Sequence, residues 1–288
     1  PALAGEFPIP QVDFATWQPL SYPCLKTDSA PHIDGKLDDA AWEAASWTEE
    51  FVDIEGDLKP LPRFRTRVKM LWDDEYFYVA ADMEEPHLWG TLTERDAVIY
   101  HDNDFEIFID PDGDTHNYYE LEINALGTVW DLLLTRPYRD GGHAVDSWDI
   151  AGLKSAVHLD GTLNDPSDED RGWSVEIAMP WKVLEECASH GGPPNEYETW
   201  RVNFSRVQWR HQISAGAYSK AIDPATGKSY PENNWVWSPQ GLIAMHYPER
   251  WGRVRFLLPG SDPEAPAPPD AAHPPGIPLT RQLHHAQR

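Results

Sequence analysis

Two neighbouring segments, residues 104–110 and 118–125, alternate apolar side chains with carboxylates and an amide. Such alternation is typical of a β-strand whose two faces differ. The apolar positions predict a core face, and Glu106, Glu122 and Asn124 fall on the reverse face. Carboxylates and amides exchange hydrogen bonds with sugar hydroxyls, while aromatic rings beside them cover the C–H faces of a pyranose. The pattern predicts a sugar-binding sheet face, and a solvated outer sheet face is the alternative that these residues leave open.

A third segment, "WRVNFSRVQW" at residues 200–209, continues this pattern. Val202 and Phe204 are expected to point inward and Asn203 outward, so Asn203 joins the candidate polar face. Arg206 departs from strict alternation, and we expect a β-bulge to re-aim its side chain.

The link between the first two segments contains "DPDGD", with carboxylates at Asp110, Asp112 and Asp114. Alternate spacing lets three oxygens converge on a hard cation such as Ca²⁺. The glutamate that completes an EF-hand loop is absent at the required spacing. A plain acidic hairpin turn is therefore the favoured interpretation, and a structural calcium site is the alternative.

Signatures of nucleophilic catalysis are absent from the sequence, which has no G-x-S-x-G, no H-E-x-x-H and no glycine-rich phosphate loop. A glycoside hydrolase, however, needs only two carboxylates at a suitable separation. With 48 acidic residues, the sequence leaves a hydrolase open as the alternative to a non-catalytic binding protein.

The elements that must position these residues are mostly short strands. In residues 65–82, two alternating runs flank Asp73-Asp74-Glu75, whose short acidic side chains are typical of a turn. Short helices are expected at Leu37–Ala45 and Pro180–Cys187. Many short strands and few helices predict an all-β fold, an antiparallel β-sandwich of the immunoglobulin or jelly-roll kind. The expected strands cover residues 65–72, 76–82, 104–110, 118–124, 127–134, 154–159, 172–179, 200–209 and 252–258.

Composition narrows the class of partner. The formal net charge of −25 repels phosphate backbones and anionic surfaces, which argues against nucleic-acid binding. No apolar run approaches the ~20 residues that a membrane-crossing helix needs. The two cysteines, Cys24 and Cys187, are compatible with one disulfide, as in exported proteins, or with two unpaired thiols.

Proline-rich segments mark both ends of the chain and suggest three regions. Residues 1–25 are predicted to form an extended arm packed on the body, and residues 26–258 a single sandwich domain. Residues 259–288 are rich in Pro and Ala and have few large apolar side chains, so we predict a disordered tail.

Five segments between residues 31 and 258 resemble, in the same order, family 9 carbohydrate-binding modules: "PHIDGKLDDAAWEAA", "VKMLWDDEYFYVAADMEEP", "DNDFEIFIDPDGD", "GWSVEIAMPW" and "PERWGRVRF". The resemblance implies a β-sandwich that binds a poly- or oligosaccharide without catalysis. It further implies association with glycan-degrading enzymes, a secreted or periplasmic location, and calcium ions with structural roles.

The resemblance assigns site residues only in part. The Trp that precedes the first acidic strand in the family corresponds to Tyr100, which can still stack on a sugar, and the acid of that strand corresponds to Glu106. The arginine of the next strand corresponds to Glu122, a reversal of charge. The second aromatic residue of the family's sugar clamp falls near Met245, and two tryptophans are close by in sequence. We predict a site formed by Tyr100, Glu106, Glu122, Asn124, Asn203 and Trp235 or Trp237.

Two further alternatives follow from the resemblance. Residues 135–152 and 209–237 are long aromatic segments beyond the family pattern, and they offer a place for a different glycan site. Related sandwiches bind haem through Met, His or Lys side chains. Side chains of these kinds stand at Met83, His87, Met245 and His246.

Overall fold

The strands that carry the predicted polar residues lie in one curled sheet. The computed structural model describes residues 18–266 of the chain, and its strands confirm the predicted all-β sandwich. Most of the predicted arm and most of the predicted tail, residues 1–17 and 267–288, fall outside the described residues.

Thirteen of the fifteen strands in the described part of the chain belong to this sheet. The first strands are β1 (Ser21–Lys26), β2 (Val52–Asp53), β3 (Thr66–Trp72), β4 (Tyr76–Glu84), β5 (Asp104–Asp110), β6 (Tyr118–Asn124), β7 (Val129–Leu134) and β8 (Ala144–Val145). The later strands are β9 (Lys154–Asp160), β10 (Gly172–Pro180), β11 (Thr199–Gln208), β12 (His211–Ser214), β13 (Ala217–Lys220), β14 (Asn233–Val236) and β15 (Gly252–Leu257). Only β12 and β13 pair apart from the large sheet.

Helices are short, as predicted. The segment expected at Leu37–Ala45 is a 3₁₀ helix, Ala40–Ala44, and the segment expected at Pro180–Cys187 is α1 (Trp181–Leu184) followed by a 3₁₀ turn. The other 3₁₀ helices are Gly56–Leu58, Ile99–His101, Tyr138–Asp140 and Pro248–Arg250. Within residues 18–266, no helix is long and apolar enough to cross a membrane.

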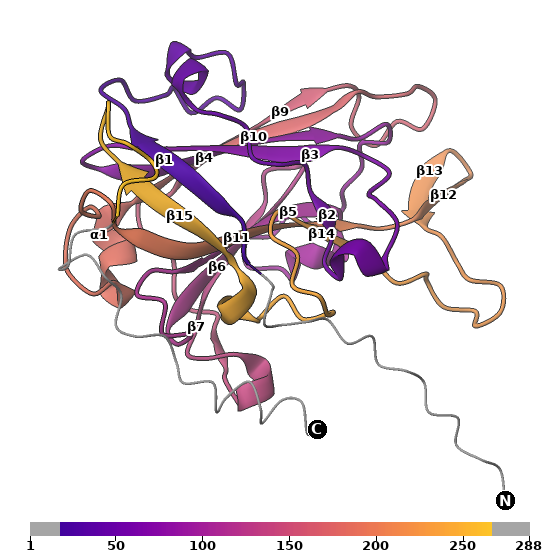
Figure 1. Cartoon of the computed structure of the whole chain (residues 1–288). Helices are drawn as coiled ribbons and strands as arrows, with labels where there is room; N and C mark the ends of the chain where they lie inside the picture. The colour runs from indigo at the N-terminus through magenta and orange to yellow at the C-terminus, as the bar shows by residue number, and fades with distance from the viewer. Residues whose placement is uncertain (1–17, 267–288) are drawn as a thin grey trace, which may run out of the picture.

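Two layers of the sheet pack face to face around one core. The strand order is β8-β7-β6-β5-β11-β15-β1-β3-β4-β10-β9, so β15 and β1 join the two layers along one edge (Figure 1). Val79 and Ile177 from the β3-β4-β10-β9 layer belong to the same core cluster as Ile107 and Phe204 from the other layer. The alternation read from the sequence therefore assigned the core faces correctly, because side chains alternate strictly along a strand.

The end of the predicted arm is a strand within the sheet. β1 pairs in parallel with both β15 and β3, while the other pairings are antiparallel. Pro23 obscured this strand in the sequence, because proline lacks the amide that a central strand needs. It is tolerated because β1 pairs with β3 only from Leu25 onward, so Pro23 lies where β15 is the only partner.

The predicted hairpin at residues 65–82 is the β3–β4 pair. Asp73 Oδ1 accepts hydrogen bonds from the amides of Glu75 and Tyr76, at 2.7 and 2.8 Å. The acidic turn is thus held by its first side chain, as its composition predicts.

The bulge predicted at Arg206 is wrong. Arg206 lies directly opposite Phe105 in regular pairing between β11 and β5, so its side chain points into the core. It is 1% exposed, and its Nη2 donates to Glu85 Oε2 at 3.0 Å. A buried carboxylate partner makes the inward orientation possible, since an unpaired buried charge would be costly.

Both cysteines carry free thiols, so the structure contains the second of the two predicted alternatives. Cys24 is fully buried in β1, and Cys187 is half-buried after α1. Burial raises the pKa of the Cys24 thiol, so this sulfur is held as an unreactive apolar group.

Candidate functional site

The polar side chains of four adjacent strands form rows on one sheet face. Ser205 of β11 lies opposite Glu106 of β5, which lies opposite Glu122 of β6, which lies opposite Trp130 of β7. Directly paired residues on antiparallel strands point to the same face. The predicted Glu106 and Glu122 are therefore neighbours, and an aromatic ring ends their row.

This face is covered rather than solvated. Glu106 is 5% exposed and Glu122 is 1% exposed. Part of the cover comes from the segment that ends in Trp251, whose ring packs on Phe108 and Tyr118 with centroids 5.5 and 5.1 Å apart. The alternative of an open outer sheet face does not describe this protein.

The side-chain amides of Asn203 and Asn124, both predicted site residues, form hydrogen bonds with backbone groups. Asn203 donates to Ser238 O at 2.9 Å and accepts from the amides of Phe204 and Ser238. Asn124 donates to Leu92 O and accepts from two amides of the turn that follows β6. Both are 0% exposed, so they hold the loops around the face and leave no polar atom for a ligand.

The carboxylates form a concentrated group beneath these loops. Glu122 Oε2 accepts from the Tyr100 amide at 2.9 Å, and Asp104 Oδ1 accepts from the Val207 amide at 3.3 Å. Burial raises the pKa of Glu106 to about 7, and burial with the nearby charge of Glu106 raises the pKa of Asp104 and Glu122 well above their usual values. The cause is desolvation of like charges in one place.

Aromatic side chains stand at the edge of this group. Tyr100 is 38% exposed and lies 6.5 Å from Trp130, with the rings inclined by 33°. Tyr138 is 48% exposed and meets the His246 ring edge-on at 4.6 Å. Burial and the charge of Glu120 raise the pKa of Tyr138 to about 12. We call Tyr100, Trp130, Tyr138 and His246 the aromatic rim.

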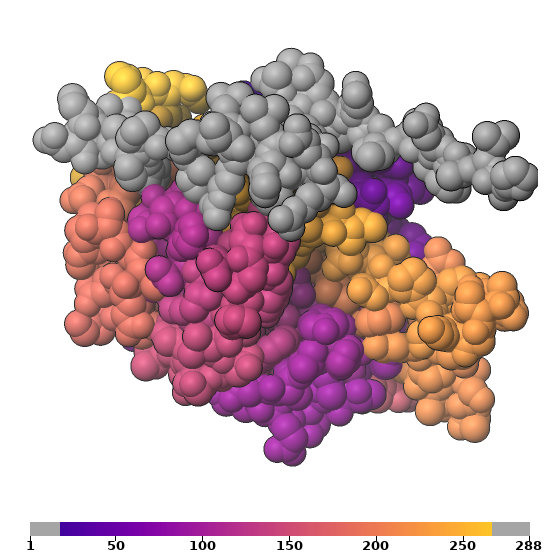
Figure 2. Space-filling model, turned by 90° about the horizontal axis from the view of Figure 1, so that it is seen from below, coloured from indigo at the N-terminus to yellow at the C-terminus, as the bar shows by residue number. Residues whose placement is uncertain are grey.

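The residues of the aromatic rim come from segments that lie far apart in the sequence. Figure 2 views the molecule from below and shows the surface hollowed where the magenta, pink and orange segments meet. Exposed rings beside buried polar groups are typical of a small-molecule site.

Trp235 and Trp237, both predicted site walls, lie in the core. Trp235 is opposite Arg206 on the core face of β14 and is 2% exposed. Trp237 is 0% exposed, packs against Phe204, and donates from Nε1 to Glu49 Oε2 at 3.1 Å. The structure does not bring either ring to the rim.

The residues that the sequence reasoning missed divide into two kinds. Asp104 and Trp130 share the face of Glu106 and Glu122, and extending the alternation along all three strands would have found them. The alternation of β6 assigns Glu120 to this face as well, but Glu120 was not among the predicted site residues. Tyr138 and His246 come from loops, and no sequence pattern places a loop side chain beside a strand. His246 Nε2 lies 3.9 Å from Glu120 Oε2.

The acidic turn after β5 is held by its own side chains. Asp110 accepts from the amides of Gly113 and Thr115, at 3.0 and 3.1 Å. Oxygens of Asp110, Asp112 and Asp114 lie within 4.8 Å of one another, which suits a cation, but Arg201 already pairs with Asp110 at 3.8 Å. These contacts account for a hairpin turn, and calcium at this turn stays a prediction.

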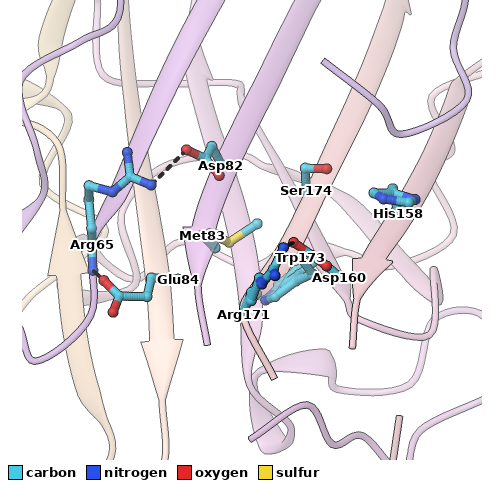
Figure 3. Close-up of a pocket in the computed structure, with 10 residues that line it drawn as sticks. Arg65, Asp82, Met83, Glu84, His158, Asp160, Arg171, Trp173 and Ser174 are labelled. Atoms are coloured by element: carbon cyan, nitrogen blue, oxygen red, sulfur yellow. Dashed lines mark hydrogen bonds and ion pairs between the residues drawn. The ribbon is translucent and has the colours of Figure 1, made fainter. Parts of the chain in front are cut away.

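Two other hollows are lined by balanced charges. One, of about 270 Å³, lies over β4 and β10, where Arg65 points to Asp82 at 3.1 Å and Arg171 lies 3.6 Å from Asp160 (Figure 3). The other, of about 680 Å³, includes Arg95, which pairs with Asp149 at 2.8 Å. Among residues 18–266, no lysine or arginine forms an ion pair with Glu106, Glu120 or Glu122, and the imidazole of His246 lies 3.9 Å from Glu120.

The side chains considered for haem are dispersed. Met83 is 1% exposed in the main core, whereas Met245 packs in the separate cluster around Trp251. His87 lies beside His211, with ring centroids 4.1 Å apart, and His246 belongs to the aromatic rim. Met245 and His246 lie beside the same cluster, whereas Met83 and His87 lie elsewhere, so the four side chains do not form one ligand set.

Comparisons with known proteins point to one family. Residues 33–192 match the family described as "Carbohydrate family 9 binding domain-like". Exoglucanase XynX of Acetivibrio thermocellus is 28% identical over 154 residues, covering 54% of this chain and 12% of the relative. Endo-1,4-beta-xylanase A of Thermoanaerobacterium saccharolyticum is 29% identical over 154 residues, covering 54% and 11%. The chain thus spans about a tenth of the length of these curated relatives.

A solved structure agrees in fold. A family 9 carbohydrate-binding module from Caldicellulosiruptor kristjanssonii, in complex with cellotriose, superposes with a TM-score of 0.51 at 15% identity. The match covers 86% of this chain and 100% of that one.

Proposed function

This chain belongs to the carbohydrate family 9 binding domain-like proteins, and from that premise we propose that it binds a poly- or oligosaccharide in the recess below the aromatic rim, without catalysing its cleavage. One observation carries the proposal. The exposed residues Tyr100 and Tyr138 both lie beside the buried carboxylates: the Tyr100 amide donates to Glu122 at 2.9 Å, and the Tyr138 ring packs on His246, whose Nε2 lies 3.9 Å from Glu120 Oε2. Rings at the sides and hydrogen-bonding oxygens at the base are what a pyranose requires.

The class of sugar follows from the relatives. Their names are those of an exoglucanase and of a xylanase, and the module from Caldicellulosiruptor kristjanssonii holds cellotriose. Cello- and xylo-oligosaccharides are therefore the first ligands to test. The same relatives support a secreted or periplasmic setting beside glycan-degrading enzymes.

Binding is tested by a glycan array on the full chain, followed by titration calorimetry with the selected glycan. Each stacked ring should contribute on the order of 1 kcal/mol. Tyr100→Ala and Tyr138→Ala should each weaken binding by roughly tenfold or less. Tyr76→Ala, which removes a ring from the other layer, should bind like the parent protein. All three need a folding check first.

Unchanged affinity in both Tyr100→Ala and Tyr138→Ala would place the site elsewhere. An assay for newly released reducing ends on the same glycan separates binding from hydrolysis. Steady release of ends would replace the binding proposal by the hydrolase alternative.

A further inference from the structure

Three groups of carboxylates converge closely in residues 18–266, and they differ in their surroundings. Each group brings three oxygens within 4.8 Å of one another. In the group of Asp96, Asp131 and Asp149, Arg95 pairs with all three carboxylates. In the turn group, Arg201 pairs with Asp110. In two of the three groups, an arginine therefore already supplies positive charge to the carboxylates.

The third group is Asp104, Glu106 and Glu122, and it is the most deeply buried of the three. Among the described residues, no lysine or arginine forms an ion pair with any of these three carboxylates. Glu120 adds a fourth carboxylate on the same face. Three or four buried acids with no positive partner are costly to ionise, and proteins normally pair such groups or use them to coordinate metals.

Unpartnered polar atoms point into the same place. Asp104 Oδ2 and Ser205 Oγ have no partner in hydrogen-bonding geometry, and both residues are 0% exposed. Ser205 stands directly opposite Glu106 in the pairing of β11 with β5. Buried polar atoms are nearly always satisfied, so oxygens gathered in one place without donors favour a ligand that accepts oxygen lone pairs.

We infer that Asp104, Glu106 and Glu122 bind one Ca²⁺ ion at the base of the aromatic rim. Calcium takes six to eight oxygen ligands at about 2.4 Å, so two ligands on opposite sides of the ion are about 4.8 Å apart. One oxygen from each of the three carboxylates lies within 4.8 Å of the other two, which is compatible with that spacing. Calcium tolerates irregular ligand sets, whereas Mg²⁺ demands a near-ideal octahedron.

The bound ion would also coordinate hydroxyls of the sugar. This part of the inference rests on the proposed function. Three carboxylates leave several coordination positions open, and neighbouring hydroxyls of a sugar are oxygen donors of the kind that calcium accepts. Glu106 and Glu120, each 5% exposed, mark where the group reaches the recess. The rim rings then cover the apolar face of the same sugar.

The test measures calcium binding by the full chain after treatment with chelator. Addition of about 1 mM CaCl₂ should raise the melting temperature by at least about 3 °C, because a ligand of the folded state stabilises it. Tb³⁺, a luminescent substitute for calcium, should bind with emission sensitised by Trp130, which lies opposite Glu122. Trp130→Phe should lose most of that emission and keep the calcium-induced rise in melting temperature.

Single-charge variants locate the ion. Glu122→Gln and Glu106→Gln, which preserve side-chain shape, should each weaken calcium binding by tenfold or more. Glu122 also accepts from the Tyr100 amide, so its substitution disturbs a backbone contact as well. Glu106 accepts from no backbone amide of the described residues, so its variant tests calcium binding without that disturbance. Asp149→Asn removes one acid from the arginine-containing group and should respond to calcium like the parent protein.

The inference is overturned by a parent protein that neither melts higher in calcium nor binds Tb³⁺. A calcium response that survives both glutamine variants but is lost in Asp112→Asn overturns it too, because the ion would then sit in the acidic turn. Glycan affinity that is equal in chelator and in calcium removes the role of the ion in sugar binding and leaves the proposed function intact. Calcium binding without any glycan binding would overturn the proposed function and leave the calcium site intact.

Discussion

Trp237 is an aromatic residue whose burial decides its role. Its ring lies so close to Gly252 that a Cβ there would come within 2.3 Å of Cζ3. We expect Trp237→Ala to lower the free energy of unfolding by about 3–5 kcal/mol, since it leaves a large cavity. The glycan affinity of the folded fraction should stay unchanged. Chemical denaturation and calorimetry check the two effects separately, and weakened binding in a fully folded variant would return Trp237 to the site.

The pair formed by His190 and Glu198 gives a pH-dependent contribution to stability. Glu198 accepts from His190 Nε2 at 2.6 Å, and this bond raises the pKa of His190 above its ordinary 6.5. Burial opposes the charge of Glu198, but the hydrogen bonds it accepts hold its pKa below the ordinary 4.5. The histidine term is lost as pH rises through its raised pKa, and the glutamate term is lost as pH falls through its lowered pKa.

The contributions of His190 and Glu198 to the free energy of unfolding are therefore both fully present between about pH 4.5 and pH 6.5. We expect His190→Gln to be less stable than the parent protein by roughly 0.5 kcal/mol near pH 5.5, because the pair is only partly buried. The difference should shrink at about pH 9. Urea denaturation at both pH values checks it, and an equal difference at the two would contradict the assignment.

At the scale of elements, one buried carboxylate anchors the segment that covers the outer face of β10. Glu176 accepts from the amides of Asp34 and Gly35, both at 2.9 Å, and from Trp42 Nε1 at 2.7 Å. Gly35 has a φ of +86°, and a Cβ at this position would approach His158 N to 2.5 Å. The tight approach requires glycine, and the carboxylate fixes the loop in that position.

Glu176→Ala should therefore destabilise the protein by about 2–4 kcal/mol, because three donors lose a charged acceptor. In this variant, the amides of residues 34–45 should exchange with deuterium faster than in the parent protein. Exchange in β5 and β6, where the variant changes no contact, should stay the same. Glu176→Gln keeps one acceptor oxygen and should show a smaller loss. Uniform acceleration across all strands would mean that the segment is not an independently anchored element.

At the scale of the whole molecule, the net charge of −25 works against the compact state. Like charges repel over about 10 Å at 0.1 M ionic strength and farther in dilute buffer. The melting temperature should rise between about 10 and 150 mM KCl, since salt screens this repulsion. NaCl at equal ionic strength should have the same effect. A melting temperature independent of both salts would show that local ion pairs offset the net charge.

Local alternation along the chain was enough to predict the sandwich and the composition of each sheet face. Alternation with a period of two is a local property, so Ile107 and Phe204 could be assigned to the core, and Glu106 and Glu122 to the opposite face, without any knowledge of the partner strands. The turn at Asp73 was equally local.

Which polar residues remain available to a ligand depends on packing between distant segments. Alternation says which side a residue takes and not what covers that side, so the closure of the face by Trp251 and the capture of Asn124 and Asn203 by backbone groups were out of reach. For the same reason, the burial of Trp237 could not be predicted from the sequence. The contact between Tyr138 and His246 could not be predicted either, because it joins loops that are far apart in the sequence. Packing between distant segments turned a patterned sheet face into a recess over carboxylates, because burial depends on what the chain places above each residue.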